Sequence, residues 1–296
     1  MADIGLVAIA AVSLGAATVN GALGYGYSSL TVPVALLVVA GRVLNPAIVV
    51  VEVFVNLVAL FLGRGAVRRV APRVAPLIVG LVPGVLLGSL LLARVAPTWV
   101  KLITFGVLLP LVLLQAAGLR WPLRRERVAA VPLGTGVGLL YSLTTISGPP
   151  LAMFFNNQGY DRADFKVALA LTRTAESTLT LIAYASLGLL GGDSNAMIAW
   201  IAPGVLIGMP LGHALIRKVD AGAFRRLCVT FDVWLIGFGL SRVLASLHLV
   251  PSPWCYQVLL VGVVADAWLL HGFFAARDRV AHLPGRLGGD RLAREG

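Results

Sequence analysis

Ionisable side chains stand inside long apolar segments of this 296-residue chain. Glu52 lies within residues 44–62, and Arg173 and Glu176 lie within residues 166–189. Ionisable groups at membrane depth are energetically costly and usually functional. A guanidinium is a permanent cation whose planar donors suit the oxygens of an oxyanion. We therefore expect Arg173 to bind an anion, and Glu52 or Glu176 to balance its charge or to carry a proton.

Other polar side chains accompany these charges. Asn56 follows Glu52 by four residues and Ser177 follows Arg173 by four, so each pair shares one helical face. Asp232 lies in another apolar segment and is a second candidate proton carrier. A structural ion pair that only seals the fold is the alternative interpretation of the arginine and the glutamates.

Two stretches rich in Gly, Ser, Thr and Pro interrupt the apolar segments, at residues 20–33 and 138–150. Glycine permits unusual backbone angles and proline removes an amide donor, so each stretch predicts a broken helix. A half-helix that begins inside the membrane points unpaired N–H groups at the gap, which favours an anion. Two proline kinks packed shut are the alternative. The hydroxyl groups expected to line the anion site belong to Ser28, Ser29, Thr31, Thr144, Thr145 and Ser147.

The elements that must position these residues are membrane helices. Hydrophobic residues make up 58% of the chain. Charged residues make up 12%, against about a quarter in soluble domains. This composition excludes a soluble enzyme, a disordered protein and a secreted disulfide scaffold, because a soluble domain could not bury so much apolar surface. It predicts an all-α polytopic membrane protein with about 8–10 membrane segments and broken, re-entrant helices.

The net charge of +11 is concentrated in basic clusters between or after the apolar segments. This placement is typical of cytoplasmic loops of inner-membrane proteins, and it argues against nucleic acid as a partner. We expect a cytoplasmic loop at residues 63–73, a cytoplasmic C-terminus and an N-terminus outside. Residues 128–156 must then enter the membrane and return as a broken hairpin. The clusters span residues 64–73, 120–127, 217–226 and 277–294.

The two halves of the chain resemble each other, and the charge pattern gives them opposite orientations. Inverted repeats with interrupted helices are the build of secondary transporters, with the substrate site near the midplane. The matching segments are residues 21–33 with 138–150, 47–56 with 168–177, and 81–88 with 205–212. The expected units are a first repeat at 1–120, a second at 128–247, an additional membrane helix at 254–275 and a basic cytoplasmic tail at 277–296.

A G-x-x-x-G span occurs twice, within residues 81–88 and within residues 205–212. Together with the paired Gly/Ser/Pro stretches, this duplicated span resembles the TauE/SafE sulfite exporter family, also called TSUP. The likeness covers residues 1–247, although residues 24–29 and 144–147 carry more hydroxyl groups than the glycine-rich run common there. The resemblance implies an exporter of sulfite, thiosulfate or a short organosulfonate in the bacterial inner membrane. It would work by alternating access with possible proton coupling. We expect the G-x-x-x-G spans to pack helices.

We expect the partners to be a small anion, the lipid bilayer and a second copy in a homodimer, with no cofactor and no metal. A membrane enzyme would need a nucleophile with its base or a metal cluster, and neither H-E-x-x-H nor G-x-S-x-G occurs. A cation carrier of the same fold would need the carboxylates of Glu52, Glu176 and Asp232 to converge while Arg173 faces away. A carrier of another organic anion and a non-transporting scaffold are further alternatives.

Overall fold

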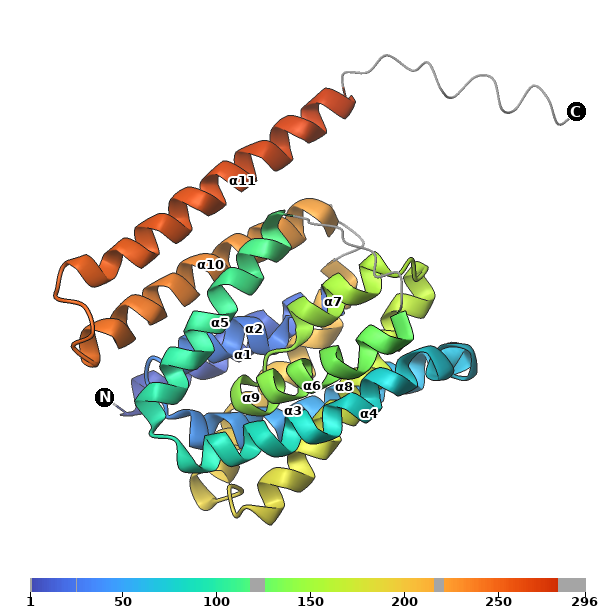
Figure 1. The fold of residues 1–296 in the computed structure, drawn as a ribbon, viewed down its shortest axis with the longest axis horizontal. Helices are drawn as coiled ribbons and strands as arrows, with labels where there is room; N and C mark the ends of the chain where they lie inside the picture. The colour runs from blue at the N-terminus through green and yellow to red at the C-terminus, as the bar shows by residue number, and fades with distance from the viewer. Residues whose placement is uncertain (1, 25, 118–125, 216–220, 282–296) are drawn as a thin grey trace, which may run out of the picture.

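The computed structural model describes residues 2–24, 26–117, 126–215 and 221–281, and every regular element among them is helical (Figure 1). Helix α11 lies at the edge of the bundle, against α10 and α5. In chain order the elements are α1 (Ala2–Leu23), α2 (Tyr27–Ala35), α3 (Gly41–Leu62), α4 (Arg64–Arg94), α5 (Pro97–Ala117), α6 (Glu126–Thr144), α7 (Gly148–Asn157), α8 (Arg162–Ser186), α9 (Gly192–Leu215), α10 (Ala221–Ser246), the short 3₁₀ helix η1 (Trp254–Tyr256) and α11 (Gln257–Ala281).

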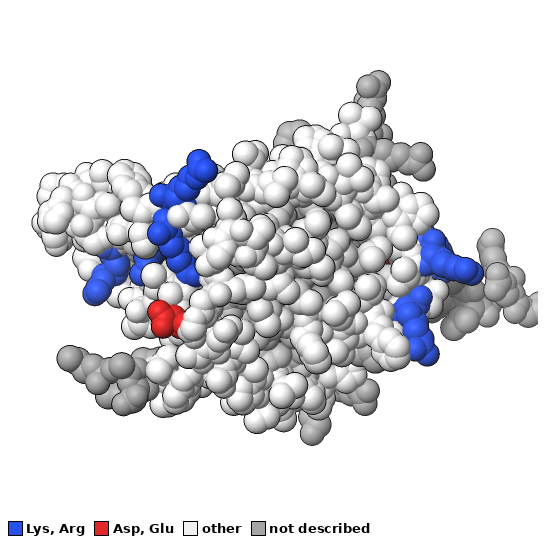
Figure 2. Space-filling model, turned by 90° about the horizontal axis from the view of Figure 1, so that it is seen from below, with Lys and Arg blue, Asp and Glu red and all other residues white. Residues whose placement is uncertain are grey.

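The outer surface of the bundle is apolar. Large side chains such as Phe54, Leu206 and Trp268 are 69%, 70% and 74% exposed. Figure 2 shows the charged side chains of one face gathered toward its two ends, with a broad uncharged band between them. Such a surface suits lipid rather than water. The helices long and apolar enough to cross a membrane are α1, α3, α4, α5, α9, α10 and α11. The prediction of an all-α polytopic membrane protein is confirmed.

Each of the two Gly/Ser/Pro stretches contains a helix break, and each break separates a long helix from a short one. The first break lies at Gly24 and Gly26, whose φ angles of 82° and 107° favour glycine. The second break lies at Thr145 to Ser147, and Thr145 has a φ of 58°. A β-branched residue is rare in that region of backbone space. Residues 128–156 thus fall into two pieces, α6 and α7, as predicted.

The helix starts correct the alignment of the two halves. Helix α2 starts at Tyr27 and α7 at Gly148, a difference of 121 residues (148 − 27), and the same difference separates the starts of α3 and α8 (162 − 41). Pairing Pro33 with Pro150, a difference of 117, is therefore wrong by about one helical turn. The physical reason is that Pro33 lies inside α2, whereas Pro150 lies in the first turn of α7, where its missing N–H costs nothing.

Each main helix contact made by α4 has a counterpart made by α9. Helix α4 packs against α6 as α1 packs against α9, and α4 packs against α8 as α9 packs against α3. Glycines make these approaches close, because a β-carbon at Gly84 would collide with the Thr135 carbonyl oxygen on α6. A β-carbon at Gly212 would likewise collide with the Thr18 carbonyl oxygen on α1. The G-x-x-x-G spans therefore pack helices, as predicted.

The expected loop at residues 63–73 is helical, which corrects the prediction. Helix α4 begins at Arg64 directly after Gly63, so the basic cluster lies on its first turns. The reason is that Arg and Ala are strong helix formers, and the positive charges mark a membrane boundary rather than a loop. Residues 120–125 and 217–220 of the basic clusters, and the tail beyond residue 281, lie outside the described residues.

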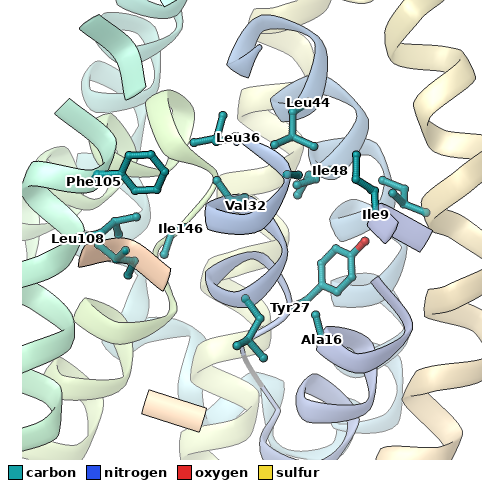
Figure 3. Packing of buried hydrophobic residues seen from close by; sticks show 14 of the residues in the cluster. Ile9, Ala16, Tyr27, Val32, Leu36, Leu44, Ile48, Phe105, Leu108 and Ile146 are labelled. Carbon is teal, nitrogen blue, oxygen red and sulfur yellow. The ribbon is translucent and has the colours of Figure 1, made fainter. Parts of the chain in front are cut away.

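Helix α2 is enclosed by the bundle, with eight of its nine residues buried. Figure 3 shows Val32 of α2 and Leu36, which directly follows α2, in one apolar cluster with Phe105 and Leu108 of α5. Ile146 of the second break belongs to the same cluster. Apolar packing thus holds the half-helix that follows the first break, and one residue of the second break takes part in it.

Candidate functional site

A buried ion pair joins the two halves of the protein. Arg173 Nη2 lies 2.6 Å from Glu52 Oε1, and the two side chains are 3% and 1% exposed. Glu52 lies on α3 and Arg173 on α8, which pack against each other. The two residues are also 121 positions apart (173 − 52), as the helix starts are. The structure therefore pairs the two charges that the repeat places opposite each other.

Tyr141 of α6 is a member of this site that the sequence analysis missed. Its hydroxyl donates a hydrogen bond of 2.7 Å to Glu52 Oε2, and the side chain is fully buried. The second oxygen of this carboxylate is thereby occupied while the first faces Arg173. Tyrosine is common in membrane helices, so the residue type gave no signal. Its place one turn before the second break was the only available clue.

The second break reaches the same cluster through Ser147. Ser147 precedes α7, and its hydroxyl donates a 2.6 Å hydrogen bond to Glu176 Oε2. Glu176 lies three residues after Arg173 on α8, so the two side chains share one helical face. We call Glu52, Tyr141, Ser147, Arg173 and Glu176 the central charged cluster.

The central charged cluster is not fully satisfied by its own hydrogen bonds. Within the described residues, Arg173 Nε and Glu176 Oε1 are buried without a hydrogen-bond partner. A guanidinium can bind an oxyanion through two parallel N–H groups, and the Nη2 group of Arg173 already faces Glu52. A guanidinium beside two carboxyl groups can exchange a bound carboxylate for a bound anion.

Asn56 and Ser177 contact the backbone of Arg173 rather than its guanidinium group. Both donate to the backbone carbonyl oxygen of Arg173, Asn56 Nδ2 at 3.4 Å and Ser177 Oγ at 2.7 Å. These contacts fix the segment of α8 that carries the guanidinium. In this conformation neither side chain is bonded to the charged group itself.

The threonines of the second break satisfy the interrupted backbone. Thr144 Oγ1 donates to the Leu140 carbonyl oxygen at 2.7 Å and accepts from the Ile146 amide at 3.1 Å. Thr145 Oγ1 donates to the carbonyl oxygen of Thr144 at 2.7 Å. Their hydroxyl groups therefore replace bonds that the break removes from the helix.

The hydroxyl residues after the first break lie elsewhere. Ser28, Ser29 and Thr31 are buried, and Ser29 Oγ donates to the Gly26 carbonyl oxygen at 3.2 Å. Among the described residues, no hydrogen bond or ion pair links these three side chains to the central charged cluster. Ser29 instead borders a small cavity that it shares with Asp232 of α10. Ser29 and Asp232 thus lie together at this cavity, apart from the central charged cluster.

An ion pair at the end of the bundle where α4 begins ties α8 to α4. Arg69 of α4 binds Asp164 in the first turn of α8, and this contact holds the pKa of the Asp164 carboxyl below its usual value. Nearby, the Arg73 guanidinium stacks over the Tyr160 ring at 3.9 Å. The connection that follows α7 is thus anchored to the first half.

Comparison with known proteins identifies the family. Residues 9–239 match the family model described as "Sulfite exporter TauE/SafE". The chain belongs to the TauE/SafE family. The match includes both breaks and the whole central charged cluster, and it ends before α11, which confirms the resemblance seen in the sequence. No curated protein and no solved structure matched the chain. TauE/SafE is a family of membrane transporters rather than of enzymes.

Proposed function

We propose that this chain is a secondary transporter that exports a small sulfur-containing anion, such as sulfite, thiosulfate or a short organosulfonate. The observation that carries the proposal is the buried pair of Arg173 and Glu52 between α3 and α8. A permanent cation at membrane depth, shared by the two halves, suits an anion that must be released to either side. Family membership supports the same substrate class.

The proposed cycle is an exchange of partners at Arg173. The arriving anion takes the place of the Glu52 carboxylate and binds the guanidinium through parallel N–H donors. Tyr141, whose hydroxyl donates to Glu52 in this conformation, then has a hydroxyl proton to offer to the anion. On release of the anion, Glu52 returns to Arg173, so the buried guanidinium is not left unpaired. An ion gradient, with protons as the proposed coupling ion, supplies the energy.

We further propose that residues 1–120 and 128–247 are inverted repeats and that the cycle rocks one against the other. The paired helix contacts support this division. The orientation proposed has the N-terminus outside a bacterial inner membrane, with the helix at 254–275 outside the repeats and the tail at 277–296 in the cytoplasm. A homodimer and the lack of a nucleic-acid partner stay predictions.

The geometry favours an anion over a cation. A cation carrier requires Arg173 to face away from the carboxylates, yet its guanidinium lies against Glu52. The hydrogen bond of Glu176 to Ser147 also occupies one oxygen that a cation would need. We therefore place the cation carrier, a carrier of another organic anion and the non-transporting scaffold behind the proposed exporter.

The test uses purified protein in liposomes with labelled sulfite, thiosulfate, sulfate and a short sulfonate, with and without a pH gradient. The Glu52→Gln/Arg173→Gln double variant removes both members of the ion pair together, so neither is left buried without the other. Its matched control is Arg226→Gln/Asp266→Gln, which removes a second buried pair, 2.8 Å long, between α10 and α11. We expect flux in the wild type and the control and none in the first variant.

Two results would overturn the proposal. One is normal anion flux through folded Glu52→Gln/Arg173→Gln protein, which would leave the central pair a structural role only. The other is the absence of flux for all four anions together with flux of a divalent cation.

A further inference from the structure

A second buried polar position lies where α1, α2, α5 and α10 meet. A cavity there is about 10 Å³ in volume, roughly the space that one water molecule needs. Its polar lining consists of Gly26 and Ser29 at the start of α2, Gln115 near the end of α5, and Cys228 and Asp232 on α10. Figure 1 shows that α5 ends at the same end of the bundle at which α10 begins. The cavity therefore lies toward that end.

Asp232 is a buried acid without a cation. It is 6% exposed, and within the described part of the chain it makes no ion pair and its Oδ1 has no hydrogen-bond partner. Among the other buried acids two have a cation, and Glu176 has a hydrogen-bond donor and lies on one face of α8 with Arg173. Glu52 pairs with Arg173, Glu176 accepts a hydrogen bond from Ser147, and Asp266 pairs with Arg226.

The surroundings of Asp232 supply little charge to hold it ionised. Cys228 is the other titratable group in the cavity wall. The walls from α1, α2 and α5 carry no charged side chain, and on α11 the acid Asp266 is engaged with Arg226. A buried carboxyl group without a cation is far cheaper neutral than charged, so it holds a proton. A metal cation would need several oxygen ligands, and this cavity offers one carboxyl group in a space for one water.

The first break gives the ionised form of Asp232 one partner. Gly26 caps α2 without a side-chain hydrogen bond, and it borders the same cavity as the carboxyl group. The first turn of a helix carries unpaired N–H groups and partial positive charge. Loss of the proton therefore creates an attraction between Asp232 and the start of α2, and gain of the proton removes it.

We infer that Asp232 is the proton-binding group of this transporter, at a site beside the first break and separate from the anion site at Arg173. In each cycle its O–H bond breaks and the proton passes to water on one side, and the bond forms again with a proton from the other side. The inference rests on the proposed anion transport, because a proton site couples only if there is a substrate to couple to.

The test separates coupling from transport in the same liposomes. Exchange of labelled for unlabelled sulfite across the membrane, without any gradient, reports the anion site alone. Accumulation of sulfite driven by an imposed pH gradient reports the coupling. For Asp232→Asn we expect exchange to be retained and pH-driven accumulation to be lost. The Arg226→Gln/Asp266→Gln control, which also loses a buried acid, should keep both activities.

A second variant covers the case in which Asp232→Asn does not fold. Asp232→Glu keeps the carboxyl group but moves it by one methylene within a tight cavity. We expect it to accumulate sulfite with a pH profile displaced from that of the wild type, because the surroundings of the carboxyl group change. Undiminished pH-driven accumulation by folded Asp232→Asn, or an unchanged profile for Asp232→Glu, would overturn the inference. Failure of the wild type to exchange sulfite would instead contradict the proposed function.

Discussion

The two helix breaks occupy equivalent places in the two halves but differ in chemistry. The residues that precede α2 and α7, Gly26 and Ser147, are 121 positions apart (147 − 26). The first break is built from glycine and borders a cavity with an unpaired acid. The second is built from Thr and Ser, whose hydroxyl groups are bonded to the backbone and to Glu176.

This difference shows how two similar helix arrangements can hold two kinds of site. The second break is tied into the central charged cluster, so its geometry is fixed by many bonds. Among the described residues of the first break, Ser29 donates a side-chain hydrogen bond to the Gly26 carbonyl oxygen, and Gly24 and Gly26 have positive φ angles that only glycine adopts easily. A pair of identical breaks would give two copies of one site. These two breaks instead border an ion cluster and a separate cavity with room for about one water molecule.

Charge removal should separate the two sites most strongly. Arg173→Gln leaves Glu52 buried without its cation, which should cost about 3–5 kcal/mol of unfolding free energy. Asp232→Asn replaces a neutral acid by an amide of similar shape, and should change stability by only about 1 kcal/mol. Thermal unfolding in detergent, followed by tryptophan fluorescence, measures both. Equal losses would contradict the view that only the second break belongs to an ion cluster.

Backbone substitutions should come next in size. Gly26→Ala forces a side chain into a φ of 107° with Val19 Cγ1 at 3.3 Å, and should cost about 1–3 kcal/mol. At the second break Thr145→Gly relieves a positive φ but loses one hydrogen bond to Thr144, so the change should stay within about 1 kcal/mol. The same unfolding assay applies. A greater loss for Thr145→Gly than for Gly26→Ala would reverse the assignment of rigidity to the second break.

Much of the fold could be predicted from the sequence because lipid leaves few alternatives for an apolar chain. The hydrophobic composition predicted the membrane helices, and the glycine and proline residues predicted the positions of both breaks. The alignment of the breaks was wrong by four residues, because Pro33 is tolerated inside α2 and proline spacing is not a reliable register mark. The basic residues from Arg64 onward were assigned to a loop, since charge reports the membrane boundary and not the helix end.

The site was predictable in its charges and not in its grouping. A charge inside an apolar segment is rare, so Glu52, Arg173 and Glu176 could be found, and the structure brings all three together. Hydroxyl residues are common and satisfy the nearest backbone group, as Thr144 does. Which hydroxyl groups reach the ion cluster depends on how neighbouring helices orient their side chains toward one another. A local sequence pattern does not predict that orientation. The same holds for Tyr141.

Hydroxyl removal gives a smaller contrast. Ser147→Ala leaves Glu176 Oε2 buried without its donor, which should cost about 1–3 kcal/mol. Ser29→Ala loses one bond to a neutral carbonyl oxygen at 3.2 Å, and should cost about 0.5–1.5 kcal/mol. Sulfite exchange should fall in Ser147→Ala and not in Ser29→Ala. If Ser29→Ala alone abolished exchange, the anion site would have to include the first break.

The smallest contrast concerns the connections that follow the two short helices. After α7, Arg69 binds Asp164 and lowers the pKa of that carboxyl. Because this pKa is lower in the folded state, the stabilisation is present above the usual carboxyl pKa, about 4. It is lost as the pH falls through the lowered value. Arg69→Gln should therefore lower the unfolding temperature slightly near neutral pH and not at all in strong acid, and high salt should shrink the effect.

The connection after α2 provides the control for this prediction. Arg42, in the first turn of α3 directly after this connection, donates to the backbone carbonyl oxygens of Leu92 and Val95, at 2.9 and 3.0 Å. Carbonyl oxygens do not titrate in this range, so Arg42→Gln should lower the unfolding temperature by the same amount at neutral and acid pH. A loss that depends on pH for both variants would point to general surface charge. A loss that depends on pH for Arg69→Gln alone would show that only the connection after α7 is held by an ion pair.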